Sequence, residues 1–343
     1  MRFPFSLTRS MTAYLMKKRL AGERMFPLVM MLEPLHACNL QCAGCGRIRE
    51  YADTLNQHLS VEQCVAALDE CGAPIVSICG GEPLLYPEIE TLVGAILARR
   101  KHIYLCTNGL LLRRKLSGFP PGDRLMINVH LDGMEATHDA AANRSGVFNE
   151  AVEGIRAAKR AGLVVCTNTT IYKQTDLDEI AVLFEYLTAL GVDGLMISPA
   201  YAYRSVTEGC QGNAAAPSPD EMFLNRDEVH ATFRRARKML GRFRLTTTPM
   251  YLDFLCGERE LPCSAWANPT YNVRGWRSPC YLVADTHYPT YRELIERTDW
   301  SAFGPGGDAR CGDCLVHCGF EPSAVLSKVR VRDILKMAVW QMT

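Results

Sequence analysis

Apolar stretches rich in β-branched residues alternate with segments of helical hydrophobic spacing between residues 26 and 199. Such alternation predicts parallel strands joined by right-handed helical crossovers. Six strands are expected, at residues 27–33, 74–79, 103–106, 125–131, 163–171 and 194–198. Helices are expected after the Ser60 N-cap, where Gln63 completes a capping box, from Tyr86, and over residues 147–161. The pattern therefore predicts an α/β fold, a partial (β/α)6 barrel of the TIM type with its active site at the carboxyl ends of the strands.

The first 25 residues show a different pattern. Apolar residues such as Leu7, Met11 and Leu15 recur at near-helical spacing, and cations that include Lys17 and Lys18 lie between them. This pattern predicts a basic amphipathic helix. Two interpretations stay open, a peripheral contact with anionic lipid and a helix packed over one end of the barrel.

Composition limits the organisation and the compartment. A chain of 343 residues, 48% of them hydrophobic, can bury one large core or a core and a smaller module. We expect an N-terminal segment (1–25), a barrel (26–245) and a cysteine-rich C-terminal domain (246–343). The net charge of +1 argues against nucleic acid as a partner. The sequence has fifteen cysteines and shows neither a signal-like apolar region nor a membrane-spanning stretch. These features predict a reducing, cytoplasmic location. A peripheral contact at the inner face of the membrane is one of the two interpretations of the N-terminal helix.

Three closely spaced cysteines follow the first predicted strand. Cys38, Cys42 and Cys45 lie in the run CNLQCAGC, and their thiolates can share one iron–sulfur cubane. A cubane normally has four cysteine ligands, so three would leave one iron open to another ligand. The alternatives are scattered core cysteines and a zinc site, for which His36 is the nearest fourth ligand.

Glycine-rich and polar turns follow the next four predicted strands, where a bound cofactor would lie. Candidate cofactor contacts at these turns are Gly80, Gly81, Glu82, Pro83, Asn108, His130 and Asp132, and the fifth predicted strand itself carries two more, Thr167 and Asn168. Two glycines before a carboxylate allow a close backbone approach and would suit an ammonium group. Structural alternatives stay open, because Asn108 before a glycine can stabilise its own turn and Thr167 and Asn168 can pair within a strand.

The C-terminal hundred residues hold a second cysteine group. Cys280, Cys311, Cys314 and Cys318 form a four-ligand set for a second cluster, with Cys263 as a substitute. A zinc knuckle that uses His317 and unligated cysteines are the competing interpretations.

The motifs CNLQCAGC, GGEP, TNG and LDG together resemble the radical S-adenosylmethionine (radical SAM) superfamily. The resemblance implies a [4Fe–4S] cluster on Cys38, Cys42 and Cys45 whose open iron binds SAM. It also implies an electron donor such as flavodoxin or ferredoxin, while the C-terminal cysteines partly resemble auxiliary-cluster modules. Gly44 departs from the aromatic residue that is common before the third cysteine, and it leaves adenine more room or another residue to pack there.

Longer phrases resemble one subfamily, the adenosylhopane synthases of hopanoid biosynthesis. These include MLEPLHACNLQCAGCGRI, DECGAPIVSICGGEPLL, YLCTNGLLL, NPTYNVRGWRSPCYL and CGDCLVHCGFE. The resemblance implies that the 5′-deoxyadenosyl radical adds to the alkene of an apolar triterpene, diploptene, to form adenosylhopane. A large apolar cavity is then needed, and its candidate lining residues are Tyr201, Tyr203, Tyr251, Phe254, Trp266 and Trp276.

Radical addition to an alkene leaves a carbon radical that must gain a hydrogen atom. Cys106, at the end of the third predicted strand, is the catalytic candidate for this step, and Cys79 is its rival. A buried free cysteine is also a common small core residue. Two other functions stay open: a radical SAM maturase that abstracts hydrogen from a peptide, and a non-catalytic metal or electron-transfer protein.

Overall fold

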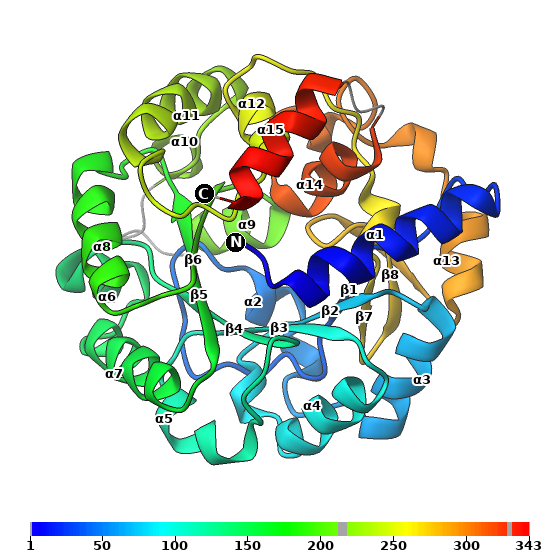
Figure 1. The fold of residues 1–343 in the computed structure, drawn as a ribbon, viewed down its shortest axis with the longest axis horizontal. Coiled ribbons are helices and arrows are strands. Elements are labelled where there is room, and N and C mark those ends of the chain that lie inside the picture. Colours follow the sequence, from blue (N-terminus) through cyan, green and yellow to red (C-terminus); the bar gives the residue numbers. More distant parts are fainter. Residues whose placement is uncertain (1, 212–217, 328–330, 343) are drawn as a thin grey trace.

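The computed structural model describes residues 2–211, 218–327 and 331–342. One curved sheet forms its centre, with the strand order β6-β5-β4-β3-β2-β1-β7-β8-β9 (Figure 1). The six parallel barrel strands are β1 (Val29–Leu32), β2 (Ile75–Ile78), β3 (His102–Thr107), β4 (Leu125–His130), β5 (Val164–Ile171) and β6 (Gly194–Pro199). All six predicted strands are present, and the α/β partial barrel is confirmed.

Helices surround the outer face of these strands (Figure 1). They are α3 (Val61–Cys71), α4 (Ile89–Ala98), α5 (Leu112–Lys115), α6 (Glu135–Ala141), α7 (Val147–Arg160) and α8 (Leu177–Ala189). The capping box of Ser60 and Gln63 forms as predicted, and α3 ends at Gly72, whose φ of 70° suits glycine. The helix expected from Tyr86 begins at Ile89, because Pro83–Leu85 form a 3-10 turn that the Glu82 side chain caps.

Side chains along each strand point alternately to two faces, one that packs against the helices and one that faces the barrel interior. Val76, Leu105 and Ile127 belong to the large core shared with the helices. Their neighbours Ser77 and Cys106 contact each other across strands on the opposite face, with Sγ of Cys106 3.5 Å from the serine hydroxyl. The interior is therefore polar near the carboxyl ends of the strands, where the predicted site lies.

The C-terminal region continues the barrel sheet. Strand β7 (Thr270–Asn272) pairs parallel with β1, and the antiparallel strands β8 (Gly275–Pro279) and β9 (Ala284–Tyr288) follow. Its helices are α9 (Arg204–Gln211), α10 (Pro219–Met222), α11 (Arg226–Leu240), α12 (Pro249–Leu255), α13 (Tyr291–Arg297), α14 (His317–Leu326) and α15 (Val331–Met342). One sheet contains strands from both sides of the predicted boundary between residues 245 and 246. The division into a barrel and a C-terminal domain therefore stays a prediction.

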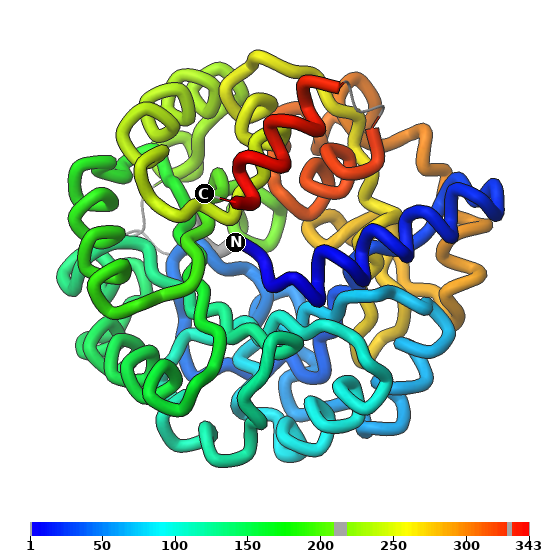
Figure 2. The backbone as a smooth tube through the Cα atoms, viewed as in Figure 1, coloured from blue at the N-terminus to red at the C-terminus, as the bar shows by residue number. Residues whose placement is uncertain are grey.

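Helix α1 (Phe5–Leu20) lies across the amino ends of the barrel strands, next to α15 (Figures 1 and 2). Leu7 is buried against Ile75 and Met126, which lie at the starts of β2 and β4. The chain termini also meet there, because the Phe3 ring packs edge-on against Trp340. The structure therefore supports the packed-helix interpretation and places α1 opposite the predicted site. Within the described ranges, no helix is long and apolar enough to cross a membrane.

Candidate active site

Cys38, Cys42 and Cys45 lie together in the loop between β1 and α2 (Arg47–Glu50), at the carboxyl end of β1. All three thiols are partly exposed. Burial, and then the charges of Cys45 and Cys38, raise the pKa of Cys42 to about 12. A metal must therefore displace protons when it binds these thiols.

The donor set of this loop suits a cluster better than a single ion. Among the residues that the structure describes, no three histidine, cysteine or acidic side chains converge as they would on one metal ion. A cubane carries each thiolate on a separate iron, so such convergence is not required. His36 is also committed elsewhere, because its Nδ1 lies 2.9 Å from the Thr54 hydroxyl and its Nε2 faces Glu33 at 3.5 Å. This arrangement removes the proposed fourth zinc ligand.

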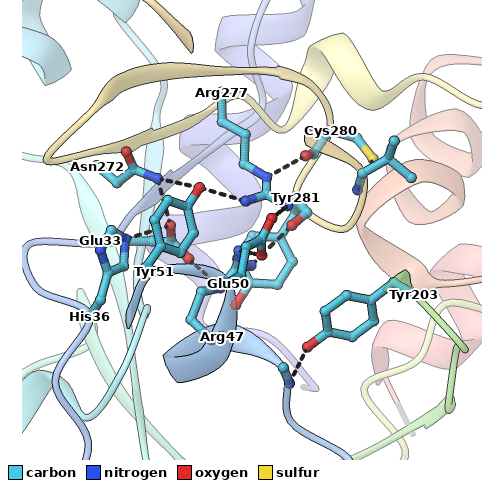
Figure 3. A network of polar contacts seen from close by, with 12 residues as sticks. Glu33, His36, Arg47, Glu50, Tyr51, Tyr203, Asn272, Arg277, Cys280 and Tyr281 are labelled. Atoms are coloured by element: carbon cyan, nitrogen blue, oxygen red, sulfur yellow. Dashed lines mark hydrogen bonds and ion pairs between the residues drawn. The ribbon is translucent and has the colours of Figure 1, made fainter. Parts of the chain in front are cut away.

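The cysteine loop begins and ends in a buried polar network (Figure 3). Glu33 at the end of β1 is fully buried and forms a 3.0 Å ion pair with Arg47, just after Cys45. Burial opposes ionisation of Glu33, but the charge of Arg47 and the bond to His36 lower its pKa to about 2. His36, just before Cys38, stacks on the Tyr51 ring with centroids 3.8 Å apart. The network therefore holds both ends of the cysteine loop.

The same network reaches the C-terminal strands (Figure 3). Asn272 of β7 donates to Glu33 Oε2 at 3.1 Å, and Arg277 of β8 pairs with Glu50 at 2.8 Å. Arg277 Nε also donates to the carbonyl of Cys280 at 2.9 Å. Sequence patterns gave no role to these residues, although Arg47 and Arg277 lie in the phrases that carry the subfamily resemblance. Arg47 and Arg277 are more than two hundred positions apart in the sequence, so no local pattern could predict that both belong to one network.

The GGEP turn lies against the backbone that leads into the cysteine loop. Gly81 N–H donates to the Leu35 carbonyl at 3.2 Å, and Glu82 N–H donates to the Ala37 carbonyl at 2.8 Å. A Cβ at Gly81 would overlap the Ala37 carbonyl. The glycines are therefore required by a close approach of two protein segments, whereas the sequence suggested an approach to a ligand. Pro83 follows as the first residue of the 3-10 turn.

The Glu82 carboxylate connects two of the predicted turns. It is buried and accepts hydrogen bonds from the Thr107 hydroxyl at 2.7 Å and from the Asn108 N–H at 2.8 Å. Burial raises its pKa despite these donors. Asn108 bonds through Nδ2 to Asn39 in the cysteine loop at 2.8 Å, and its Oδ1 accepts from Leu110 N–H in its own turn. Glu82 and Asn108 thus hold the cysteine loop and the third-strand turn together.

His130 and Asp132 form a pair at the end of β4. Nε2 of His130 lies 2.7 Å from Oδ2 of Asp132. Burial alone would lower the pKa of His130, but the charge and hydrogen bond of Asp132 raise it. Asp132 also accepts from the Thr170 N–H at 2.8 Å. A carboxylate with these partners fixes the imidazole at the mouth of the barrel.

The two candidates on β5 lie on opposite faces of the strand. Thr167 is fully buried and has the same strand phase as Val165 and Ile171, which pack against the helices. Its side chain therefore faces away from the interior, which corrects the prediction for this residue. Asn168 has the opposite phase, and its buried Oδ1 has no hydrogen-bond partner among the described residues. Oγ1 of Thr167 also has no partner among the described residues, but only Asn168 faces the barrel interior, so Asn168 is the better candidate for a ligand contact.

Gly44 has no side chain, and an aromatic residue that follows another strand lies in the space beside it. A Cβ at Gly44 would overlap Oη of Tyr172, which follows β5 directly. Tyr172 therefore lies against the cysteine loop, at the position that the sequence left open to another residue. Tyr203 contributes a second contact, because its hydroxyl accepts from the Gly46 N–H at 2.8 Å.

Cys106 lies in the barrel interior beside Asn128 as well as Ser77. Nδ2 of Asn128 is 3.8 Å from the Cys106 sulfur. Burial raises the pKa of the thiol, and the bonds from Ser77 and Asn128 only partly offset this effect. Cys79 is buried too and interacts with Tyr281 and Arg47 of the buried network. Both thiols keep their protons at neutral pH.

A cavity of about 1050 Å³ opens beside the cysteine loop and is lined by polar and apolar groups alike. Tyr201 and Tyr203 line it, as predicted. Three other predicted lining residues, Tyr251, Phe254 and Trp276, are at most 1% exposed and belong to the hydrophobic core. Trp266 packs on Phe26 beside α1. The prediction that these four residues line the cavity was wrong, because the sequence does not show whether an aromatic side chain lies in the core or lines a cavity.

The chain divides between two family models. Residues 32–187 match the radical SAM superfamily, and residues 195–337 match a domain of unknown function (DUF3463). Residues 32–187 form a radical SAM domain. A domain of this superfamily uses a [4Fe–4S] cluster and SAM, and the match covers a little less than half of the chain.

Curated relatives share only part of this chain. GTP 3′,8-cyclase 1 of Mycobacterium tuberculosis (strain CDC 1551 / Oshkosh) is 27% identical over 175 residues, which cover 48% of this chain and 49% of the relative. GTP 3′,8-cyclase of Mycolicibacterium smegmatis (strain ATCC 700084 / mc(2)155) is 33% identical over 157 residues, with coverages of 43% and 44%. The chain spans about half the length of the curated relatives it matches.

A solved structure resembles the fold over most of the chain. Streptococcus suis SuiB has a TM-score of 0.63 at 14% identity, and the match covers 92% of this chain and 78% of SuiB. This likeness concerns the fold alone. The radical SAM domain thus has relatives of differing names, and none of them identifies the substrate of this chain.

Proposed function

We propose that this radical SAM enzyme adds the 5′-deoxyadenosyl group to the alkene of a hopanoid triterpene such as diploptene, forming adenosylhopane. The cluster would be held by Cys38, Cys42 and Cys45 and, with SAM, would supply the 5′-deoxyadenosyl radical. The proposal rests on the subfamily resemblance and on one structural observation, the position of the Cys106 thiol.

Cys106 suits a reaction that ends in hydrogen donation. Addition to an alkene leaves a carbon radical, which becomes saturated when the S–H bond breaks and a C–H bond forms. One electron from an external reductant, such as flavodoxin or ferredoxin, and one proton from solvent would then restore the thiol. A protonated thiol in the barrel interior, held by Ser77 and Asn128, meets this need. A hydrogen-abstracting maturase requires no such donor, because its adenosyl radical takes the hydrogen atom.

The large cavity also fits an adenosyl–triterpene product. Pockets for small molecules commonly measure ~300–1,000 Å³, and this cavity of about 1050 Å³ is slightly larger than that range. Phe223, Leu282 and Val283 offer apolar surface, whereas Arg49 and Glu50 offer polar groups near the cysteine loop. Most of the lining side chains are charged or polar, so the lining suits the adenosine half of such a ligand, and the apolar half would contact the few apolar side chains.

The decisive experiment uses the anaerobically reconstituted, reduced enzyme with SAM and either diploptene or GTP. Mass spectrometry should find an adenosine–triterpene adduct with diploptene and no new product with GTP. Free 5′-deoxyadenosine without an adduct would reject the proposed substrate. A cyclised GTP product would assign the chain to the activity named for its curated relatives.

Cys106→Ala tests the donor, with Cys79→Ala as its matched control. We expect Cys106→Ala to spare SAM cleavage and to lower saturated product at least tenfold, and Cys79→Ala to keep the product yield. Unchanged yield and stereochemistry in Cys106→Ala would remove Cys106 from the reaction.

We further propose that the face formed by α1 and α15 rests on an anionic membrane. Phe5 is 65% exposed, Leu20 87% and Leu335 61%, and Lys17 and Lys18 lie in the last turns of α1. Because this face is opposite the cavity, it would anchor the enzyme and would not deliver substrate directly. Leu20→Glu with Leu335→Glu should weaken flotation with phosphatidylglycerol vesicles, and equal flotation would contradict the contact.

A further inference from the structure

The start of helix α9 packs against the residue that follows the third cysteine of the cysteine loop. Tyr203 precedes this helix, and its hydroxyl accepts the Gly46 N–H at 2.8 Å (Figure 3). A Cβ at Gly46 would lie 2.5 Å from the hydroxyl oxygen of Ser205 and would also overlap the Ser205 backbone. Glycine is therefore required at this position, because two chain segments approach closely. The contact brings two hydroxyl groups beside Cys45.

Arg49 joins the same two segments. Its Nη2 donates to the Cys45 carbonyl at 2.7 Å, and its Nε donates to the Ser205 carbonyl at 3.0 Å. Among the residues that the structure describes, no carboxylate pairs with this guanidinium. Arg49 therefore places a positive charge next to the third cysteine. The side chain is exposed, so solvent and salt screen part of this charge.

The hydroxyl of Ser205 has no hydrogen-bond partner in the described part of the chain. Its oxygen is buried all the same. A buried hydroxyl without a partner is costly, and native proteins keep few of them. The sulfur atoms of an iron–sulfur cluster accept hydrogen bonds. A cluster in the neighbouring loop would therefore supply the acceptor that the chain itself does not offer.

The hydroxyl of Tyr203 also has a hydrogen left to donate. Its oxygen accepts the Gly46 N–H, and no atom of the described residues accepts the phenolic hydrogen. Burial, and then the charge of Cys45, raise the pKa of this phenol. The phenol therefore stays protonated close to the third thiolate.

Tyr203 and Ser205 come from a different part of the chain than the cysteine loop. The loop lies in residues 32–187, which match the radical SAM superfamily, whereas both hydroxyl groups lie in residues 195–337, which match the domain of unknown function. The second segment thus completes the surroundings of a cofactor that the first segment holds.

We propose that Tyr203, Ser205 and Arg49 together raise the reduction potential of the cluster in the cysteine loop. The two hydroxyls donate hydrogen bonds to sulfur atoms of the cluster or its ligands, and the guanidinium adds positive charge. One added electron makes the cluster more negative, so each of these groups stabilises the reduced form more than the oxidised form. A reduced flavodoxin or ferredoxin can then pass its electron to the cluster. This inference does not depend on the substrate proposed above.

Ser205→Ala is the sharpest test, because it removes a hydroxyl without a partner and keeps the carbonyl that Arg49 binds. The full chain is reconstituted anaerobically with iron and sulfide, and the EPR signal that Cys42→Ala lacks is titrated against potential without SAM. We expect the ratio of reduced to oxidised cluster at a fixed potential to fall about threefold in Ser205→Ala and about fivefold in Tyr203→Phe, the effect of one hydrogen bond. An unchanged ratio in both variants would overturn the proposal.

Arg49→Met tests the charge, with Arg204→Met as its matched control. The Arg204 side chain is 89% exposed and pairs with Glu208 at 2.7 Å, so its removal should leave the ratio unchanged. Arg49→Met should lower the ratio about threefold. An equal decrease in both arginine variants would exclude a specific role for Arg49.

A second measurement separates a change in potential from a loss of structural support. In Tyr203→Phe and Ser205→Ala, SAM cleavage driven by excess dithionite should stay within about twofold of the unaltered enzyme, while cleavage driven by reduced flavodoxin falls. Equal losses with both reductants at an unchanged potential would mean that these residues only hold the cysteine loop in place, and would contradict the proposal.

Discussion

The two cysteine groups of this chain differ in ligand number and surroundings. Cys38, Cys42 and Cys45 lie in one short loop that contacts the barrel mouth, and three thiolates leave a cubane with one open iron. The C-terminal group offers five thiols around an enclosed cavity, with backbone donors aimed at several sulfurs. A cluster with three thiolate ligands would bind a substrate at its open iron. A cluster with four would serve only in electron transfer or structure.

The polar network between the groups shows what they share. Arg47 follows the first group and Arg277 precedes Cys280, and both guanidinium groups pair with Glu50. A single carboxylate thereby joins the two loops. We infer that the relative position of the groups is fixed by buried charge and not by the sheet alone.

The largest expected effect concerns SAM cleavage. Cys42→Ala should lower 5′-deoxyadenosine formation by more than a thousandfold, because two thiolates cannot hold the cubane with its open iron. Cys314→Ala should leave SAM binding measurable, since it keeps all three thiols of the first cysteine group. Isothermal titration and product analysis under anaerobic conditions provide the comparison. Equal loss of SAM binding in both variants would show that the two groups act as one site.

The second prediction concerns the link between the groups. Arg47→Met leaves the Glu33 carboxylate buried without its 3.0 Å partner and should lower the free energy of unfolding by about 3–5 kcal/mol. Chemical denaturation of the metal-free protein measures this loss. Arg99→Met is the matched control, because its pair with Asp69 is exposed and should contribute less than about 1 kcal/mol. A loss in Arg47→Met as small as in the control would exclude the network as a structural link.

Sequence patterns predicted the barrel better than they predicted the C-terminal region. The six barrel strands are apolar runs that alternate with helical segments, so their positions came within a few residues. Strands β7 to β9 were missed, because short sequences such as TYN and ADTHY are largely polar and have no helical segment between them. Cys106 was correctly expected near the barrel interior, since it ends a predicted strand. The roles of Tyr172 and Arg47 required long-range contacts that no local pattern contains.

The third prediction uses a titrating group near the second cysteine group. Glu321 lies one helical turn after Cys318, and burial raises its pKa to about 7 from the ordinary 4.5. The folded chain therefore keeps a proton that the unfolded chain releases, and stability should fall as pH rises from about 4.5 to about 7. Glu321→Gln should remove this slope and stabilise the metal-free protein at pH 8 by about 3 kcal/mol. The Gln oxygen still accepts the bond from Thr248 N–H. An unchanged slope would mean that other groups set the pH dependence.

The smallest expected effect concerns the aromatic residue beside the first cysteine group. Tyr172 lies against Gly44 in the first loop, whereas Tyr201 lines the cavity of the C-terminal cysteines. If Tyr172 stacks on the organic part of SAM, Tyr172→Leu should raise the Kd for SAM about fivefold, which corresponds to about 1 kcal/mol. Tyr172→Phe should keep the affinity, and Tyr201→Leu should leave it unchanged because a closed cluster binds no SAM. Equal weakening by both leucine variants would mean that the aromatic residues act through packing, and the distinction between an open and a closed site would then rest on ligand number alone.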